Sequence, residues 1–184
     1  MSVSRDRDTD ADAGDALPWQ AWRDAVCDTA VDEGLRAIWA DVEAAIAARS
    51  PTCWISGRCC KFETFGHRLY VTGLETAWTL RQLEQAGDAA AIRLAATSEV
   101  SLDGCVFQIN GMCSVHAIRP LGCRLFFCQQ GTEQWQQDLY EVMLKRLRSL
   151  HELHGLAYVY ADWRWLLGLG GAAMGRAGLD DTHG

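Results

Sequence analysis

Hydrophobic residues recur at helical spacing near the start of the chain. Between residues 18 and 50 they follow one another at intervals of three, four or seven, with one longer gap, at Trp19, Trp22, Val26, Leu35, Ile38, Trp39, Val42 and Ile46. Pro18 suits the first position of a helix, and Ser50-Pro51 provides a stop. The pattern predicts an amphipathic helical segment, with Gly34 as the point at which it divides in two.

Further helices are predicted downstream. Thr72 and Glu75 have the spacing of a capping box, which predicts a helix from Thr72 to about Gln85, broken at Gly87. A shorter helix is expected from Asp88 to Ala96. After Thr132 a long amphipathic helix is predicted, ended by Gly155, with its apolar face at Trp135, Leu139, Val142, Met143, Leu147, Leu150 and Leu153.

The last part of the chain is harder to assign. Tyr158, Tyr160, Trp163 and Trp165 alternate with other residues over 156–167, which fits a strand or a last helix, and both readings stay open. Residues 168–184 are rich in glycine and are predicted to form a loose C-terminal tail. Residues 1–16 alternate Asp with small or basic residues and are predicted to form a disordered acidic tail.

A hairpin completes the predicted fold. The stretch 106–109 reads as a strand, and Asn110-Gly111 is a typical hairpin turn. The fold class is therefore mainly α-helical with a small β-hairpin. We expect a compact single domain over residues 17–167, built around a cysteine-ligated metal site at 53–128 and flanked by amphipathic helices.

Charge and composition narrow the possible partners. The formal net charge is −7, which disfavours binding to nucleic acid or to an anionic membrane surface. The N-terminus lacks a basic region followed by an apolar run, so no secretory signal is expected. No apolar stretch reaches the roughly 18 residues that a membrane-spanning helix needs. We therefore expect a cytoplasmic protein with reduced cysteines.

The cysteines are the main chemical signal. In a reducing compartment, clustered cysteines are more typical of metal binding than of disulfides, with redox or thiol chemistry as the main competitor. Thiolates are the natural ligands of zinc and of iron–sulfur clusters. Cys27 stands apart beside an apolar stripe and is predicted to be a core residue. The candidate metal ligands are the other seven: Cys53, Cys59, Cys60, Cys105, Cys113, Cys123 and Cys128.

Neighbouring residues add to this hypothesis. Gly57 can adopt the positive φ that a tight metal-binding loop needs. Between residues 53 and 128 there are 7 Lys and Arg and 6 Asp and Glu, so this segment carries +1 and the rest of the chain −8. Arg58, Lys61, Arg119 and Arg124 flank cysteines, where they would lower thiol pKa values if they are not simply surface cations. His116, three residues after Cys113, is a minor candidate ligand.

The hairpin offers a geometric test of a shared site. A two-residue turn would pair Gln108 with Cys113 and place Cys105 and Cys113 on opposite faces, because side chains alternate along a strand. A three-residue loop would place both cysteines on one face. A shared metal therefore predicts the three-residue loop.

The whole pattern resembles the YkgJ-like family of cysteine-cluster proteins, described as putative zinc- or iron-chelating domains. That family is marked by Cys-x-x-Cys-x-x-Cys-Cys, a Thr-x-x-Glu helix start, a spaced cysteine pair, Arg-Pro and Cys-Arg. The matching residues here span about 53 to 128: Cys53, Gly57, Cys59, Cys60, Thr72, Glu75, Cys105, Cys113, Arg119-Pro120 and Cys123-Arg124. The resemblance implies a metal-chelating core.

One position departs from that pattern. Ser56 stands where the family has its second cysteine, and serine is a weaker ligand for soft metals. Either the site has lost one ligand, or Cys128 or His116 replaces it, or this position was never essential. The departure bears on the type of centre more than on metal binding itself.

Three function classes remain. The first is a metal-binding protein holding an iron–sulfur cluster or zinc, and we favour the cluster because the cysteines are numerous and few histidines lie near them. The second is a metal-assisted transferase, since flagellin lysine methylases have a similar cysteine pattern. The third is an electron-transfer or iron-sensing module. The sequence does not decide whether the protein is an enzyme or which protein partners it has.

Overall fold

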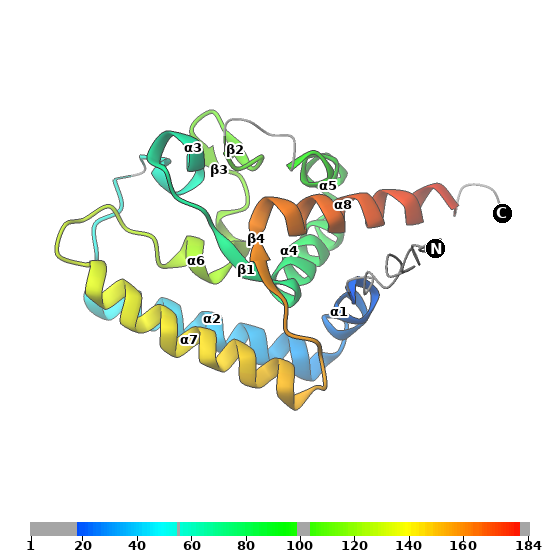
Figure 1. The fold of residues 1–184 in the computed structure, drawn as a ribbon, viewed down its shortest axis with the longest axis horizontal. Coiled ribbons are helices and arrows are strands. Elements are labelled where there is room, and N and C mark those ends of the chain that lie inside the picture. The colour runs from blue at the N-terminus through cyan, green and yellow to red at the C-terminus, as the bar shows by residue number, and fades with distance from the viewer. Residues whose placement is uncertain (1–17, 55, 99–103, 181–184) are drawn as a thin grey trace, which may run out of the picture.

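Helices account for most of the chain in the computed structural model, which describes residues 18–54, 56–98 and 104–180 (Figure 1). The α-helices in these ranges are α1 (Trp19–Ala25), α2 (Thr29–Arg49), α3 (Phe62–Phe65), α4 (Gly73–Gln85), α5 (Ala89–Ala96), α6 (Leu121–Arg124), α7 (Glu133–Leu153) and α8 (Trp163–Asp180). The strands are β1 (Tyr70–Thr72), β2 (Gln108–Ile109), β3 (Met112–Cys113) and β4 (Tyr160–Asp162), and short 3-10 turns include η1 (Arg58–Cys60) and η3 (His116–Ile118). The predicted class, mainly helical with a small hairpin, is confirmed. The predicted acidic tail, 1–16, lies outside the described residues.

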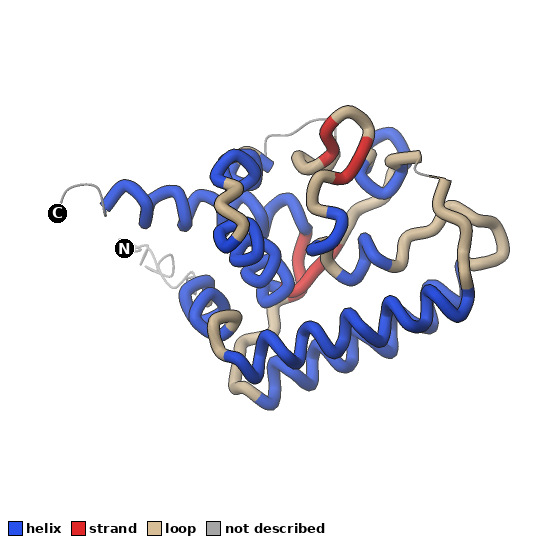
Figure 2. Tube along the Cα trace, turned by 180° about the vertical axis from the view of Figure 1, so that it is seen from behind, coloured by secondary structure: helices blue, strands red, loops and turns tan. Residues whose placement is uncertain are grey.

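The two long helices α2 and α7 lie side by side along one edge of the molecule (Figures 1 and 2). The break before α2 falls at residues 26–28, so the prediction of a division at Gly34 was wrong. Asp28 is extended, and its carboxylate accepts hydrogen bonds from the N–H groups of Ala30 and Val31, which starts a new helix. Gly34 instead permits close packing, because a Cβ there would lie 2.6 Å from Cδ1 of Leu150 on α7.

The capping box at the start of α4 is confirmed. Thr72 Oγ1 accepts from the N–H of Glu75, and the Glu75 carboxylate accepts from the N–H of Thr72. Thr72 also ends β1, which pairs antiparallel with β4 in the register Tyr70–Asp162 to Thr72–Tyr160. The open question about residues 156–167 is thereby answered, because this segment contains first a strand and then the start of α8.

The glycine-rich C-terminal segment is helical up to Asp180, so the loose tail predicted from residue 168 was wrong over 168–180. Its small residues let α8 lie against α5 (Figure 1). A Cβ at Gly171 would lie 2.5 Å from the backbone nitrogen of Ala96, so this close approach requires glycine. Tertiary packing therefore outweighs the low helix propensity of glycine here.

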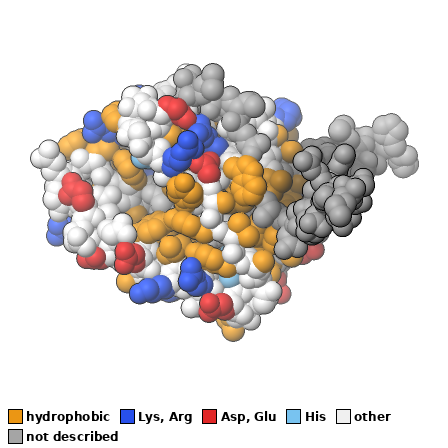
Figure 3. All heavy atoms as spheres, viewed as in Figure 1, with side chains coloured by type: hydrophobic (Ala, Val, Ile, Leu, Met, Phe, Trp, Pro, Cys, Tyr) orange, Lys and Arg blue, Asp and Glu red, His pale blue; other side chains and the backbone are white. Residues whose placement is uncertain are grey.

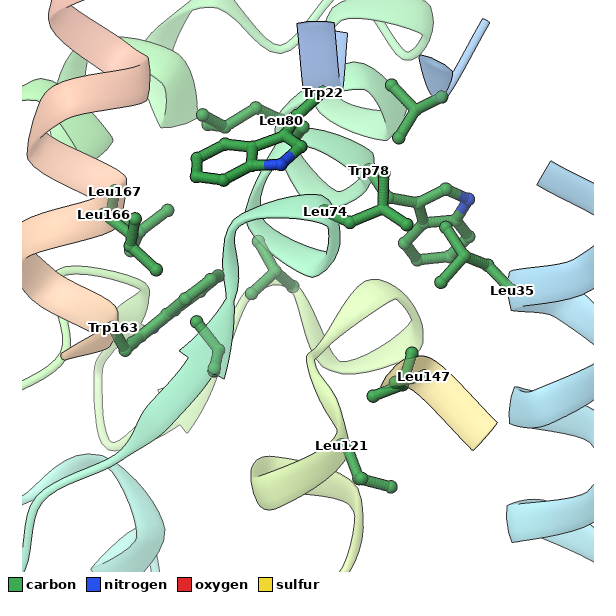
Figure 4. Packing of buried hydrophobic residues seen from close by; sticks show 14 of the residues in the cluster. Trp22, Leu35, Leu74, Trp78, Leu80, Leu121, Leu147, Trp163, Leu166 and Leu167 are labelled. Carbon is green, nitrogen blue, oxygen red and sulfur yellow. The ribbon is translucent and has the colours of Figure 1, made fainter. Parts of the chain in front are cut away.

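The hydrophobic core lies where α4 meets its neighbours. Figure 4 shows Trp22, Leu74, Leu80, Trp163 and Leu166 converging from α1, α4 and α8. Leu35, Trp78, Leu121 and Leu147 extend the same core towards α2, α6 and α7 (Figure 4). Helix α4 therefore lies in the core, between α8 on one side and α2 and α7 on the other. Among the described residues, no helix has both the length and the apolar character that crossing a membrane requires.

The hairpin has the shorter of the two loops considered. Gln108 pairs with Cys113 and Ile109 with Met112, so the turn contains only Asn110 and Gly111. The three-residue loop predicted from a shared site was wrong. The argument failed because β2 begins only at Gln108, whose N–H bonds to the carbonyl of Cys105 in a tight turn. Side-chain alternation therefore does not extend back to Cys105.

Candidate metal centre

The two cysteine segments are joined through their backbones. The N–H of Cys105 donates to the carbonyl of Cys60 at 2.8 Å, and Gln108 Nε2 donates to the carbonyl of Gly57 at 3.0 Å. Gly57 has φ +65°, as predicted for a tight loop, and its carbonyl also accepts from the N–H of Cys60. The hairpin and the η1–α3 segment consequently lie next to each other (Figures 1 and 2).

Four thiols meet at the centre of this junction. The Cys60 side chain is buried, and its thiol interacts with those of Cys59, Cys105 and Cys113. The sulfurs of Cys59 and Cys60 are 3.9 Å apart. All four are free thiols. Cys105 lies 45 residues after Cys60 in the chain, and Cys113 lies 8 residues after Cys105. This convergence is the contact between distant loops on which the metal hypothesis depends.

The pKa values of the four thiols shift in opposite directions. The hydrogen bond from Cys60 lowers the pKa of Cys59 to about 6 and that of Cys113 to about 7, against an opposing effect of burial. The same partner lowers the pKa of Cys105. The interactions with Cys105 and Cys113 raise the pKa of Cys60, which donates to them. Near neutral pH this cluster can therefore supply thiolates, which are the form that binds metals.

Cys123 reaches the same region from α6. Burial raises its pKa, and negative charge on Cys105, Cys59 and Cys113 would raise it further, which places it close to all three. The start of α6 is held by the fully buried Glu75, whose Oε1 accepts from the N–H of Leu121 at 2.9 Å. Glu75, the glutamate of the α4 capping box, thus also positions α6 and, with it, Cys123.

The buried guanidinium of Arg124 holds the segment before α6. It donates to the carbonyls of Arg119 and Ala117 at 2.8 and 2.9 Å and to Glu43 on α2 at 3.0 Å. It also lies over the ring of Trp39, 4.8 Å from the centroid. Arg124 is therefore a structural cation that fixes η3, not one that faces the thiols as its position beside Cys123 suggested.

Arg119 is the cation that acts on the thiols. Its charge lowers the pKa values of Cys59 and Cys113 and opposes the rise at Cys123. Arg119 Nη1 donates to His116 Nε2 at 2.6 Å, and burial lowers the pKa of His116, followed by the charges of Arg119 and Arg124. The neutral imidazole borders the pocket with one nitrogen already engaged. Arg58, by contrast, lies over the ring of Phe65, 4.5 Å from its centroid.

The outer cysteines line a pocket of about 290 Å³ that opens beside the four-thiol group. Cys53 is exposed, and Cys128 Sγ lies 3.4 Å from Ser56 Oγ. The cysteines on the pocket wall are Cys53, Cys59, Cys60, Cys113, Cys123 and Cys128. Cys105 is not on this wall but contacts Cys60, so all seven predicted ligands fall in one region. Cys27 is exposed, with its thiol 3.4 Å from the carbonyl of Arg23, so the prediction of a core cysteine was wrong.

The side chains are gathered but not arranged as a formed metal site. Within the described ranges, no group of three or more His, Cys, Asp or Glu side chains has a geometry that could hold a metal ion. The four-thiol group therefore offers the donor atoms that soft metals prefer, but not the geometry of a metal site.

Sequence reasoning missed several residues that shape this region. Glu75 was recognised only as a helix cap, and its bond to Leu121 depends on tertiary contact. Gln108 was treated only as a hairpin residue, although its amide ties the hairpin to Gly57. The proximity of Ser56 to Cys128 could be anticipated from the sequence. Ser56 stands where the family that the chain resembles has a cysteine, and Cys128 was named as its possible replacement.

The chain was also compared with models of known protein families, with curated proteins and with solved structures. None of the three comparisons found a match.

Proposed function

We propose that the chain is a metal-binding protein whose clustered cysteine thiolates hold zinc or iron. The observation that carries this proposal is the contact of the Cys60 thiol with three other thiols, two of them from a distant segment. Free thiols in a core are usually single and inert, whereas here one thiol contacts three others whose pKa values are lowered, which is the chemistry that soft-metal ligands need. The resemblance to the YkgJ-like family points to the same chemistry.

The four cysteine thiols are of the type that binds zinc and iron. Four thiolates around a divalent ion leave a net charge of about −2, and the nearby Arg119 guanidinium offsets part of it. Binding would require the four side chains to turn towards a common centre. The backbone hydrogen bond from Cys105 to Cys60 already holds the two segments next to each other.

The number of cysteines and the scarcity of histidines near them favour an iron–sulfur cluster, which Cys thiolates hold, over a zinc ion. The separation of 3.9 Å between Cys59 Sγ and Cys60 Sγ is that of two hydrogen-bonded thiols, so the metal is identified by its analysis and not by this distance.

The proposed metal would join the loop at 53–60 to the segment at 105–128. Because a site of this kind does not exist in the unfolded chain, its binding free energy adds to folding stability. We therefore expect the metal to have a structural effect whether or not it also takes part in a reaction.

The test is anaerobic purification followed by metal analysis and a visible absorption spectrum. Stoichiometric zinc without colour supports a single tetrahedral site. Iron with acid-labile sulfide and broad visible absorption supports a cluster. Protein that contains neither metal, takes up neither on reconstitution and is no more stable in their presence would refute the proposal.

Two serine variants sharpen this test. Cys59→Ser removes a thiol of the four-thiol group and should lose metal and unfold more readily. Cys27→Ser changes an exposed cysteine remote from that group and should keep the metal. Equal metal retention in the two variants would refute this choice of ligands.

A further inference from the structure

A second cavity adjoins the cysteine pocket. It has a volume of about 490 Å³ and shares Cys59, Cys123 and Phe126 with the pocket described above. Its aromatic wall is formed by Tyr70, Phe126, Phe127, Tyr140 and Tyr160 together with the imidazole of His67. Figure 3 shows hydrophobic side chains gathered over the middle of this face, where β1, β4 and α6 lie in Figure 1. The size and the lining are those of a small-molecule site.

The paired hydroxyls of two tyrosines are the hydrogen-bonding groups of the aromatic wall. The ring of His67 is stacked on Phe126 with ring centroids 5.2 Å apart, and its Nε2 is buried. Tyr140 and Tyr160 share a hydrogen bond of 2.5 Å between their hydroxyls. Burial raises the pKa of both, so both hydroxyls keep their protons at neutral pH.

The charged side chains at the rim are of both signs. Arg68 and Glu133 both line the cavity and both are exposed. Arg68 already pairs with Asp162 at 3.5 Å. Opposite charges at the rim give the cavity no preference for one sign of ligand charge. Aromatic faces favour a flat ring, which can stack on them at little cost in conformational freedom.

We propose that this cavity binds a small planar aromatic molecule that carries a hydroxyl or a ring N–H, and holds it beside Cys59 and Cys123. The hydroxyl oxygens of Tyr140 and Tyr160 can accept the ligand's hydrogen bond, and the rings of Phe126 and the tyrosines stack on it. The inference rests on the proposed function only in one respect, which is that the ligand would then lie next to the metal. The shared wall makes the cavity a route by which such a molecule meets the metal centre.

The experiment uses the purified full-length chain, with its metal content measured on the same sample. Phenol and indole serve as probes, and cyclohexanol serves as a non-aromatic control of similar size. Ligand-observed NMR titrations should give saturable binding of both aromatic probes with dissociation constants of about 1 mM, typical of so few heavy atoms. Cyclohexanol should bind at least about tenfold more weakly, because it cannot stack.

Matched tryptophan variants on α7 locate the binding. Gln137 is exposed and lines the cavity, so Gln137→Trp should fill it and weaken both probes at least about tenfold. Gln134 is exposed one turn earlier and does not line the cavity, so Gln134→Trp should leave binding unchanged. Tyr160→Phe keeps a flat ring but removes one of the paired hydroxyls, and it should weaken phenol by about tenfold.

The outcomes separate this inference from the metal proposal. No saturable binding of phenol or indole, equal binding of cyclohexanol, or equal effects of the two tryptophan variants would each overturn the ligand assignment. If the sample holds its metal and the probes do not bind, only this inference fails. If the probes bind with the expected pattern to protein that contains neither metal, takes up neither on reconstitution and is not stabilised by them, the cavity assignment stands and the metal proposal fails.

Discussion

Ser56 Oγ lies 3.4 Å from Cys128 Sγ, so a hydroxyl and a thiol reach the same part of the cysteine pocket. In the family pattern that the chain resembles, a cysteine occupies the position of Ser56. Cys128, which belongs to the other cysteine segment, therefore places a thiol next to the position at which that pattern has its second cysteine. Of the alternatives open for this position, this contact favours replacement by Cys128 over replacement by His116, whose Nε2 is engaged by Arg119.

An exchange of these two side chains tests that replacement. Cys128→Ser should weaken metal binding by at least about 10-fold, because a soft ligand or its close neighbour is lost. The double variant Ser56→Cys/Cys128→Ser puts a thiol back on the opposite side of the same contact and should recover most of the affinity. Competition against a chromophoric chelator measures both. Unchanged affinity in Cys128→Ser would exclude Cys128 from the site.

His151 tests another residue-scale effect, the cost of burying a titratable ring. It is fully buried on α7, with Nδ1 3.0 Å from the carbonyl oxygen of Ala157 and Nε2 without a partner among the described residues. Burial lowers its pKa below the ordinary value of 6.5, so the native protein keeps the ring neutral. The Nδ1–H then donates to Ala157 and joins the end of α7 to the segment before β4.

The free energy of unfolding should consequently fall on acidification below about pH 6.5. In this window the unfolded chain binds a proton at His151 and the native chain does not, so the contribution of the group is present at higher pH and lost as pH falls. One such group adds a slope of at most about 1.4 kcal/mol per pH unit. Urea unfolding from pH 7 to 5 measures it, and His151→Gln should have the smaller slope. Identical slopes would contradict this assignment.

At the scale of elements, the sequence predicted those whose signals are local. The capping box of α4, the end of that helix before Gly87 and the extent of the long α7 all depend on residues within one or two turns of each other, and all were correct. The predicted apolar face of α7 was wrong at Val142 and Leu153, which are exposed. The break between α1 and α2 was misplaced because Gly34, a usual breaker, serves packing against Leu150. The effective signal was Asp28, an ordinary N-cap residue that carries no apolar periodicity.

The errors in the site have a similar origin. Candidate ligands could be chosen from clustering alone, and all seven fall in one region. Their arrangement could not, because it depends on the backbone bond between Cys60 and Cys105 and on the turn from Cys105 to Gln108 that precedes strand β2. Burial of single residues was equally unpredictable, as the exposed Cys27 shows. Clustering in the sequence selected the cysteines that meet in space, whereas tertiary hydrogen bonds decide their geometry.

Helix α8 gives an element-scale prediction in which two effects have opposite signs. Helix propensity alone says that Gly171→Ala should stabilise α8 by about 1 kcal/mol. The added Cβ would, however, lie 2.5 Å from the backbone nitrogen of Ala96, and backbone cannot move aside as a side chain can. We expect the clash to dominate and to destabilise the protein by about 1–3 kcal/mol. Thermal and urea unfolding measure the difference, and a stabilised variant would show that α5 and α8 are less tightly packed.

At the scale of the whole molecule, the proposed metal lies to one side of the main core. The α2–α7 layer is held by Leu35, Leu147 and Leu150 and by an ion pair between Arg146 and Asp41 at 2.5 Å. These contacts involve no cysteine. The cysteine region has instead two-residue strands, one-turn helices and a few bonds such as Cys105 to Cys60. Elements so short are not stable alone, so their order depends on what joins them.

Metal removal should therefore loosen the molecule unevenly. After chelation, backbone amides of η1, the β2–β3 hairpin and α6 should exchange hydrogen much faster, because their few bonds lose the proposed metal cross-link. Amides in the middle of α2 and α7 should stay protected, because the apolar contacts between those helices remain. Hydrogen exchange followed by mass spectrometry, with and without metal, gives both values on one sample. Equal protection of the hairpin in the two states would mean that the thiols need no metal to hold these loops together, and equal loss throughout would mean that the α2–α7 layer cannot persist without the cysteine region.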